Sequence, residues 1–179
     1  MPMATDQYRL EDIARDHRID AGVFVPFAIV RLRSDQDSTE ATIEALLRDV
    51  VDSGDHQRIV RLAWSAESGP VHPLAVQERT VTEWAACGVA CAVAFLYARL
   101  RVFSVAAGGD RFDYWVSDGE RDYALEMSGT MASDVEDRHR IKVRQLREYH
   151  HGVDGYVIVV GFVSRSVIFS FNRFEEEVR

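Results

Sequence analysis

The segment WAACGVACAVAFLYARL, residues 84–100, restricts most strongly how this chain can fold. It is apolar nearly all round a helix, and such a helix needs protein or lipid on every side. Its length of about 17 residues falls short of the roughly 20 that cross a bilayer. The segment therefore predicts a buried central helix. Cys87 and Cys91 lie four residues apart on it, and we expect buried, unbridged thiols.

The composition favours a single globular domain. The chain has 179 residues, 47% apolar and 28% charged, with no interior linker rich in Gly, Ser or Pro. The N-terminal region is charged from Asp6 onward and has no apolar leader, which predicts a cytoplasmic protein that does not bind membranes. A net charge of −8 disfavours bulk attraction to nucleic acid, so any such contact must come from a local basic patch.

Hydrophobic periodicity and turn residues predict an α/β fold with a mixed sheet flanked by helices. Ile43, Leu46, Leu47 and Val50 recur at helical spacing, whereas residues 22–34 are rich in β-branched and aromatic residues, with Pro26 suggesting an edge strand or a bulge. The expected helices cover residues 8–20, 39–54, 82–100 and 134–149, and the expected strands cover 22–34, 56–66, 101–107, 111–118, 121–129, 155–163 and 166–172.

The stretch FDYWVSDGERDYALEMSGT, residues 112–130, reads as two strands joined by a Ser-Asp-Gly turn. Side chains alternate between the two faces of a strand, so Glu126 shares a face with Ala124 and Ser128. Small neighbours leave room above Glu126, and Asp113 can reach the same place from the other strand. Two carboxylates that converge in this way suit Mg²⁺ or Mn²⁺, although two acidic residues on a hairpin can also be an ordinary solvated face.

Residues of about 80–165 resemble the core of the PD-(D/E)XK nuclease superfamily, the restriction-endonuclease-like fold, and in particular its RecB-like branch. The resemblance rests on Asp113 in GGDRFDYWV, Glu126 in LEMSG, and Gln145 and Tyr149 in KVRQLREY, which are similar to the acidic, D/E-x-K and Q-x-x-x-Y motifs. It implies hydrolysis of DNA phosphodiester bonds, with Asp113 and Glu126 binding Mg²⁺ or Mn²⁺. It also implies that Gln145 and Tyr149 orient the site or the substrate, in a setting such as bacterial defence.

The sequence departs from this pattern at Ser128, which stands where the D/E-x-K motif has lysine. A serine hydroxyl cannot supply the positive charge that stabilises a reacting phosphate. Lys142 is the only lysine in the chain, and it precedes Gln145 by one helical turn on the same face. Migration of the catalytic lysine to this helix occurs in the superfamily. We therefore expect either an inactive site or a site in which Lys142 replaces the missing lysine.

The helix expected at residues 134–149 is strongly basic in an acidic protein. Its arginines are the expected nucleic-acid contacts, namely Arg138, Arg140, Arg144 and Arg147. The alternative is a solvated helix whose arginines pair with its own acidic residues. Glu83, near the start of the central helix, is similar to an accessory acidic position in some family members, but it also complements the helix dipole. The pair His150 and His151 is better explained by the helix C-terminus than by metal binding.

Residues 80–179 form the expected nuclease-like core, and residues 1–79 are an extension of unknown role that can belong to the same domain. Nothing in the sequence indicates a nucleotide cofactor. Two alternatives to a nuclease remain open at this point. One is an inactive domain of the same fold that acts as a binding or assembly subunit, and association with a second copy or with a partner protein subunit is left open as well. The other is a small protein-binding module of the immunity or antitoxin kind.

Overall fold

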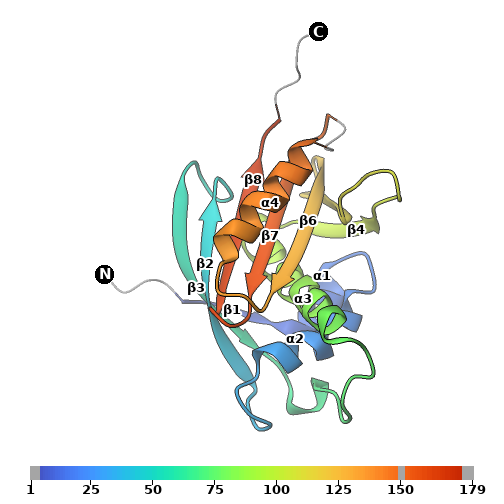
Figure 1. Ribbon diagram of the computed structural model, residues 1–179, viewed down its shortest axis with the longest axis vertical. Coiled ribbons are helices and arrows are strands. Elements are labelled where there is room, and N and C mark those ends of the chain that lie inside the picture. The colour runs from blue at the N-terminus through green and yellow to red at the C-terminus, as the bar shows by residue number, and fades with distance from the viewer. Residues whose placement is uncertain (1–4, 149–151, 175–179) are drawn as a thin grey trace.

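A mixed eight-stranded sheet organises the chain, and the computed structural model describes residues 5–148 and 152–174 of it. The strand order is β1-β3-β2-β8-β7-β6-β5-β4 (Figure 1). The strands are β1 (Thr5–Arg9), β2 (Glu40–Arg48), β3 (Asp55–Ala63), β4 (Arg101–Val105), β5 (Tyr114–Ser117), β6 (Asp122–Thr130), β7 (Gly155–Gly161) and β8 (Ser166–Asn172). The helices are α1 (Ile13–Asp16), α2 (Val25–Leu32), α3 (Glu78–Ala98) and α4 (Val135–Glu148), and short 3₁₀ turns cover Leu10–Asp12, Ala21–Phe24 and Ala66–Ser68. The α/β class with a mixed sheet, which the sequence predicts, is thus confirmed.

Strands from the first 79 residues belong to the same sheet as the rest. β2 runs parallel to β8 with Leu46 opposite Ile168, β3 pairs antiparallel with β2, and β1 lies outermost, parallel to β3. Parallel pairing of β6 with β7 through α4 forms a β-α-β unit, and β5 and β4 continue the sheet in antiparallel fashion. The N-terminal segment therefore extends the sheet instead of forming a separate layer.

Helices cover both faces of the sheet around β7. α4 packs on β6, β7 and β8 on one face, and α3 with α1 and α2 packs on the other (Figure 1). Along β7, Tyr156 and Ile158 contribute to the core under α3, while Val157 and Val159 contribute to the core under α4. A strand covered on both faces is apolar along its whole length. The continuous apolar run expected to be a buried strand is confirmed here.

The predicted central helix is α3, and its apolar surface is buried inside the protein. It is long and apolar enough to span a membrane by length and composition alone, but most of it is enclosed by the sheet, α1 and α2. The helix begins at Glu78, four residues before the expected Thr82. Thr82 is not a cap, because its hydroxyl donates back to the Glu78 carbonyl at 3.1 Å within the helix.

Two predictions for the first half of the chain are wrong. Residues 25–32 form α2 instead of a strand, with Val25, Ala28, Ile29 and Leu32 buried at helical spacing. Pro26 stands in the first turn, where its missing N–H costs nothing. The segment expected to be a helix at 39–54 is β2. Its apolar residues are compatible with either period in the sequence, but Ile43, Ala45 and Leu47 are buried alternately as in a strand, and pairing on both edges with β3 and β8 decides the outcome.

The N-terminal segment also differs from its prediction. The expected helix at residues 8–20 is divided into the end of β1, a 3₁₀ turn and the four-residue α1. The later elements agree with the sequence within a few residues, including the β5–β6 hairpin and its turn at Gly119, which has φ +97°. Asp134 caps α4, since its side chain accepts the Asp137 N–H at 2.9 Å.

Glycines in β7 allow α4 to lie close to the sheet. A Cβ atom on Gly155 would lie 2.8 Å from Leu146 Cδ2 and 3.0 Å from the Ala124 carbonyl, and one on Gly161 would overlap Val135. Val135 and Leu146 are the buried apolar residues near the two ends of α4. Because Leu146 packs directly on Gly155 and Val135 packs directly on Gly161, the α4 side chains between these two residues can reach β6.

Candidate functional site

Asp113 and Glu126 converge on one place, as the sequence predicts. Asp113 lies just before β5, and its N–H donates to the Leu125 carbonyl at 3.2 Å. Its carboxylate accepts the Met127 N–H at 2.8 Å, which aims the side chain across β6. Glu126 is only 5% exposed, and it lines the same cavity as Asp113. The hairpin is therefore more than a solvated acidic surface.

A cavity of about 530 Å³ lies over these carboxyl groups. Its lining comes from the segment before β5, from β6 and from α4, and comprises Arg111, Phe112, Asp113, Glu126, Lys142, Gln145 and Glu148. The small side chains of Ala124 and Ser128 lie on the α4 face of β6 with Glu126, while Leu125 and Met127 face α3. The expected strand register is thus confirmed.

Lys142 enters this cavity from α4. Its ammonium group donates to the Glu126 carboxylate, and the two side chains are 20% and 7% exposed, respectively. Lys142 lies within the stretch of α4 that Val135 and Leu146 hold against β7. The only lysine in the chain therefore contacts one of the two predicted acidic residues, although it comes from a different element than the motif position.

The two carboxyl groups lie in an environment that resists negative charge. Burial, followed by the proximity of Asp113, raises the pKa of Glu126, and Lys142 offsets part of this effect. Burial also raises the pKa of Asp113, against the opposing effects of the Met127 N–H and Lys142. Two buried carboxyl groups this close together disfavour simultaneous ionisation, and a nearby cation relieves that repulsion. Groups perturbed in this manner inside a cavity are typical of functional sites.

Ser128 contacts a different cation, the guanidinium group of Arg138. The Arg138 Nε atom donates to the Ser128 hydroxyl at 2.9 Å, and both residues lie on the interface between β6 and α4. Arg138 precedes Lys142 by one helical turn, so the two cations stand over alternate residues of the same strand face. The guanidinium group of Arg138 therefore places a positive charge beside Ser128, the position at which the motif has lysine.

The remaining predicted cations of α4 point away from the site. Arg140, Arg144 and Arg147 are exposed, and Arg140 pairs with Asp137 at 2.8 Å on the helix surface. Gln145 is exposed as well, but it lines the cavity. The helix therefore separates its basic residues into a partly buried group that faces β6 and an exposed group that faces solvent.

Two further predictions concern Tyr149 and Glu83. Tyr149 lies outside the described residues, as do His150 and His151. Glu83 belongs to the second turn of α3 and pairs with Arg79 at 3.0 Å. It does not line the carboxylate cavity, although its charge is the weakest of the contributions to the pKa of Asp113.

The sequence analysis missed Arg111, Phe112 and Glu148 as lining residues. Glu148 lies three residues after Gln145 on α4, so helical periodicity is a signal that places both on one side. Arg111 adopts a left-handed backbone conformation with φ 57°, and no sequence signal indicates this. Both residues add charge to the mouth of the cavity.

The donor set fits Mg²⁺ or Mn²⁺ in part. Asp113 and Glu126 supply hard carboxylate oxygens, and the raised pKa values of both groups mark a place where positive charge is favourable. Among the described residues, no group of three or more His, Cys, Asp or Glu side chains is arranged to hold an ion. Magnesium commonly uses one or two carboxylates and completes its shell with water and substrate phosphate. Two protein ligands are therefore sufficient for this class of site.

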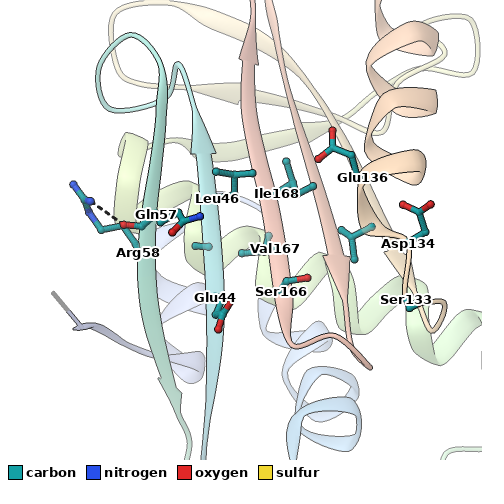
Figure 2. Close-up of a pocket in the computed structure, with 12 residues that line it drawn as sticks. Glu44, Leu46, Gln57, Arg58, Ser133, Asp134, Glu136, Ser166, Val167 and Ile168 are labelled. Carbon is teal, nitrogen blue, oxygen red and sulfur yellow. Dashed lines mark hydrogen bonds between the residues drawn. The ribbon is translucent and has the colours of Figure 1, made fainter. Parts of the chain in front are cut away.

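Another cavity, of about 320 Å³, lies beside β2, β3, β8 and the start of α4, away from these carboxyl groups. Figure 2 shows Leu46 and Ile168 on the sheet face, with Asp134 and Glu136 on the helical side. Glu136 is paired with Arg48 through two hydrogen bonds of 2.7 and 2.8 Å, which tie α4 to β2. None of the residues predicted for the site line this cavity.

Both cysteines are free thiols on α3. Cys91 is fully buried in α3, as expected, whereas Cys87 is only partly buried, with its sulfur 3.9 Å from the Tyr114 hydroxyl. Burial raises the pKa of both thiols, that of Cys87 to about 12. Neither thiol is therefore a reactive group.

Comparison with protein-family models found no match, and comparison with curated proteins and with solved structures found no significant similarity to this chain.

Proposed function

We propose that this protein is a metal-dependent nuclease of the PD-(D/E)XK type whose catalytic lysine is supplied by α4. The observation that carries the proposal is the contact of Lys142 with Glu126 beside Asp113, inside one cavity. A purely structural role does not account well for this cluster. Two carboxyl groups with raised pKa values and one half-buried ammonium group destabilise a folded protein more often than they stabilise it.

Each residue has a defined role in this proposal. Asp113 and Glu126 hold a divalent cation, which when bound neutralises phosphate charge and lowers the pKa of water. Lys142 holds the Glu126 carboxylate in place and directs its ammonium toward the cavity, where it stabilises the charge that develops on the phosphate. Gln145 orients the substrate at the rim. The substrate class is DNA, and the basic residues of α4 attract the phosphate backbone of the DNA.

The proposal is tested by cleavage of plasmid and linear DNA with Mg²⁺ or Mn²⁺. We expect Asp113→Asn and Lys142→Ala each to reduce the rate by about 10²–10³-fold, the usual cost of losing one group that stabilises transition-state charge. Arg121→Ala is the control, since Arg121 is exposed in the β5–β6 turn and lines none of the cavities described.

Circular dichroism must show that each variant is folded, because loss of Lys142 also destabilises the protein. Metal-dependent cleavage at the wild-type rate by folded Lys142→Ala would contradict the role of Lys142. Absence of cleavage by the wild-type protein with either metal, on both single- and double-stranded DNA, would contradict the nuclease proposal.

A second candidate is an inactive domain of the same fold that binds nucleic acid. The described residues offer only two carboxylates for a cation, and the motif position is a serine already bonded to Arg138. This candidate predicts DNA binding that does not depend on metal and is unchanged in Asp113→Asn. Cleavage that disappears in Asp113→Asn would exclude it.

A further inference from the structure

A second charged cavity, of about 520 Å³, lies at the C-terminal end of β6. Three arginines from three helices line it, Arg31 of α2, Arg79 of α3 and Arg138 of α4, together with Glu78, Glu83 and the chain at residues 129–131. The lining therefore carries three positive and two negative charges in a chain whose net charge is −8.

The end of β6 is open toward this cavity. β5 pairs with β6 only from Asp122 to Leu125, so the strand beyond that point pairs with β7 alone among the described residues. On the α3 side, Gly129 lies so close to the helix that an added Cβ would be 2.7 Å from the Thr82 carbonyl. Gly129 itself is buried against α3, and the chain becomes partly exposed at Thr130 and exposed at Met131, where it lines the cavity.

Arg138 connects this cavity with the carboxylate site. Its Nε atom is bound to Ser128, two residues along β6 from Glu126, a separation of about 6.6 Å along a strand. Within the described part of the chain, the two terminal nitrogens of its guanidinium have no hydrogen-bond partner. Lys142 over Glu126 and Arg138 over Ser128 therefore form a short row of cations that leads into the second cavity.

Arg31 is a fixed cation on the opposite wall. Its side chain is 14% exposed, and it donates to the Thr82 hydroxyl at 3.1 Å and to the Glu78 carbonyl at 3.0 Å. Its ionic partner, the Glu78 carboxylate, is 86% exposed, so solvent screens much of that negative charge. An arginine that the fold holds in one orientation is well suited to phosphate recognition, because little side-chain entropy remains to be lost.

We propose that this cavity binds a phosphate group of the substrate strand on one side of the bond that is cleaved. The strand then follows β6 from Lys142 to Arg138, and Arg31, Arg79 and Arg138 surround the flanking phosphate. Contacts of this kind set the register of a nucleic acid without reading its sequence. The inference rests on the proposed function for the location of the cleaved bond, whereas the anion-binding property of the cavity does not depend on catalysis.

The test is equilibrium binding without divalent metal. Fluorescence anisotropy of a short fluorescein-labelled DNA is measured in EDTA over a series of salt concentrations for wild type, Arg138→Ala, Arg79→Ala and the control Arg121→Ala. We expect each of the two cavity variants to bind several-fold more weakly and to lower the salt dependence by about one phosphate contact. The control is expected to match wild type.

Free phosphate and strand phosphate are separated by a calorimetric titration with inorganic phosphate. Weak or undetectable binding of phosphate, with DNA binding that depends on the two arginines, supports the strand proposal. Tight binding of inorganic phosphate by a protein that does not bind DNA would overturn it. Because the Arg79 side chain is 84% exposed, Arg79→Ala remains a usable test even where Arg138→Ala fails to fold.

Failure of this inference is distinguishable from failure of the proposed function. Metal-dependent cleavage with salt dependences that are unchanged in both cavity variants would overturn the inference and leave the nuclease intact. Reduced salt dependences in a protein that does not cleave DNA would support the anion cavity and overturn the nuclease proposal.

Discussion

Among the described residues, Lys142 is the only cation that is hydrogen-bonded to Glu126. Replacement of Lys142 by methionine removes this cation and keeps an unbranched side chain of similar length. We expect this variant to be less stable than wild type, by an amount that increases with pH. The physical reason is that Glu126, whose side chain is 7% exposed, must then either remain charged without its partner or take up a proton. A buried carboxylate takes up the proton, and this limits the loss.

The magnitude follows from the geometry of the pair. Breaking a fully buried ion pair by removing one partner costs about 3–5 kcal/mol. Here Lys142 is partly exposed, and the pKa of Glu126 is already raised, so protonation is inexpensive near neutral pH. We expect a loss of about 2 kcal/mol at pH 7, with an increase of up to about 1.4 kcal/mol for each further pH unit.

Urea denaturation at a series of pH values measures this loss. Arg121→Met is the matched control, and we expect a change of less than about 0.5 kcal/mol, because its side chain is exposed. The double variant Lys142→Met with Glu126→Gln removes both charges and should recover at least half of the loss. A loss that is the same at pH 6 and pH 8, or a double variant as unstable as Lys142→Met alone, would refute the reasoning.

Two other predictions concern the packing of α4 and the protonation of Asp113 and Glu126. Gly155→Ala should cost about 1–3 kcal/mol because its Cβ would lie 2.8 Å from Leu146 Cδ2, whereas Gly108→Ala, with no atom within 4 Å, should change stability little; equal urea midpoints for the two variants would contradict this account. The pKa values of Asp113 and Glu126 are raised in the folded state. Between the ordinary carboxyl pKa and the raised pKa values, the folded protein therefore binds more protons than the unfolded chain. The free energy of unfolding falls as pH rises through that window. Mn²⁺ competes with those protons, so its increase of the melting temperature should be larger at pH 8 than at pH 6 and absent in Asp113→Asn; an increase that is constant with pH would contradict a shared carboxylate site.

The second half of the fold follows from local sequence signals. In α3 and β7 the apolar runs are long enough to exclude alternatives, and turn residues such as Gly119 bound the hairpin. In the first half the strand expected at residues 56–66 is confirmed as β3, but the local signals of other segments conflict with the final structure. Val25–Leu32 has strand-forming residues at helical spacing, and Glu40–Arg48 permits both periods. Packing against α3 decides the first case, and pairing with β3 and β8 decides the second.

For the candidate site, the sequence alone indicates several of the residues that the structure brings together. The alternation along β6 places Glu126 and Ser128 on one face, and helical spacing places Lys142 and Gln145 together on α4. It does not indicate that Arg138 contacts Ser128, because that contact depends on how far α4 descends onto β7. The sequence does not indicate Arg31 as a cavity residue either. The sequence predicts a strand for its segment, and the cavity forms between helices.

What the sequence by itself determines is therefore a set of local choices: a central helix too apolar to be exposed, a hairpin with two acidic residues on it, and a basic helix with a single lysine. Only the tertiary structure decides the distances among them. Glycines at both ends of β7 let α4 approach the sheet, and that approach brings Lys142 to Glu126 and Arg138 to Ser128. Periodicity specifies the face on which a side chain lies, whereas contact between side chains of two elements depends on packing between residues far apart in the chain.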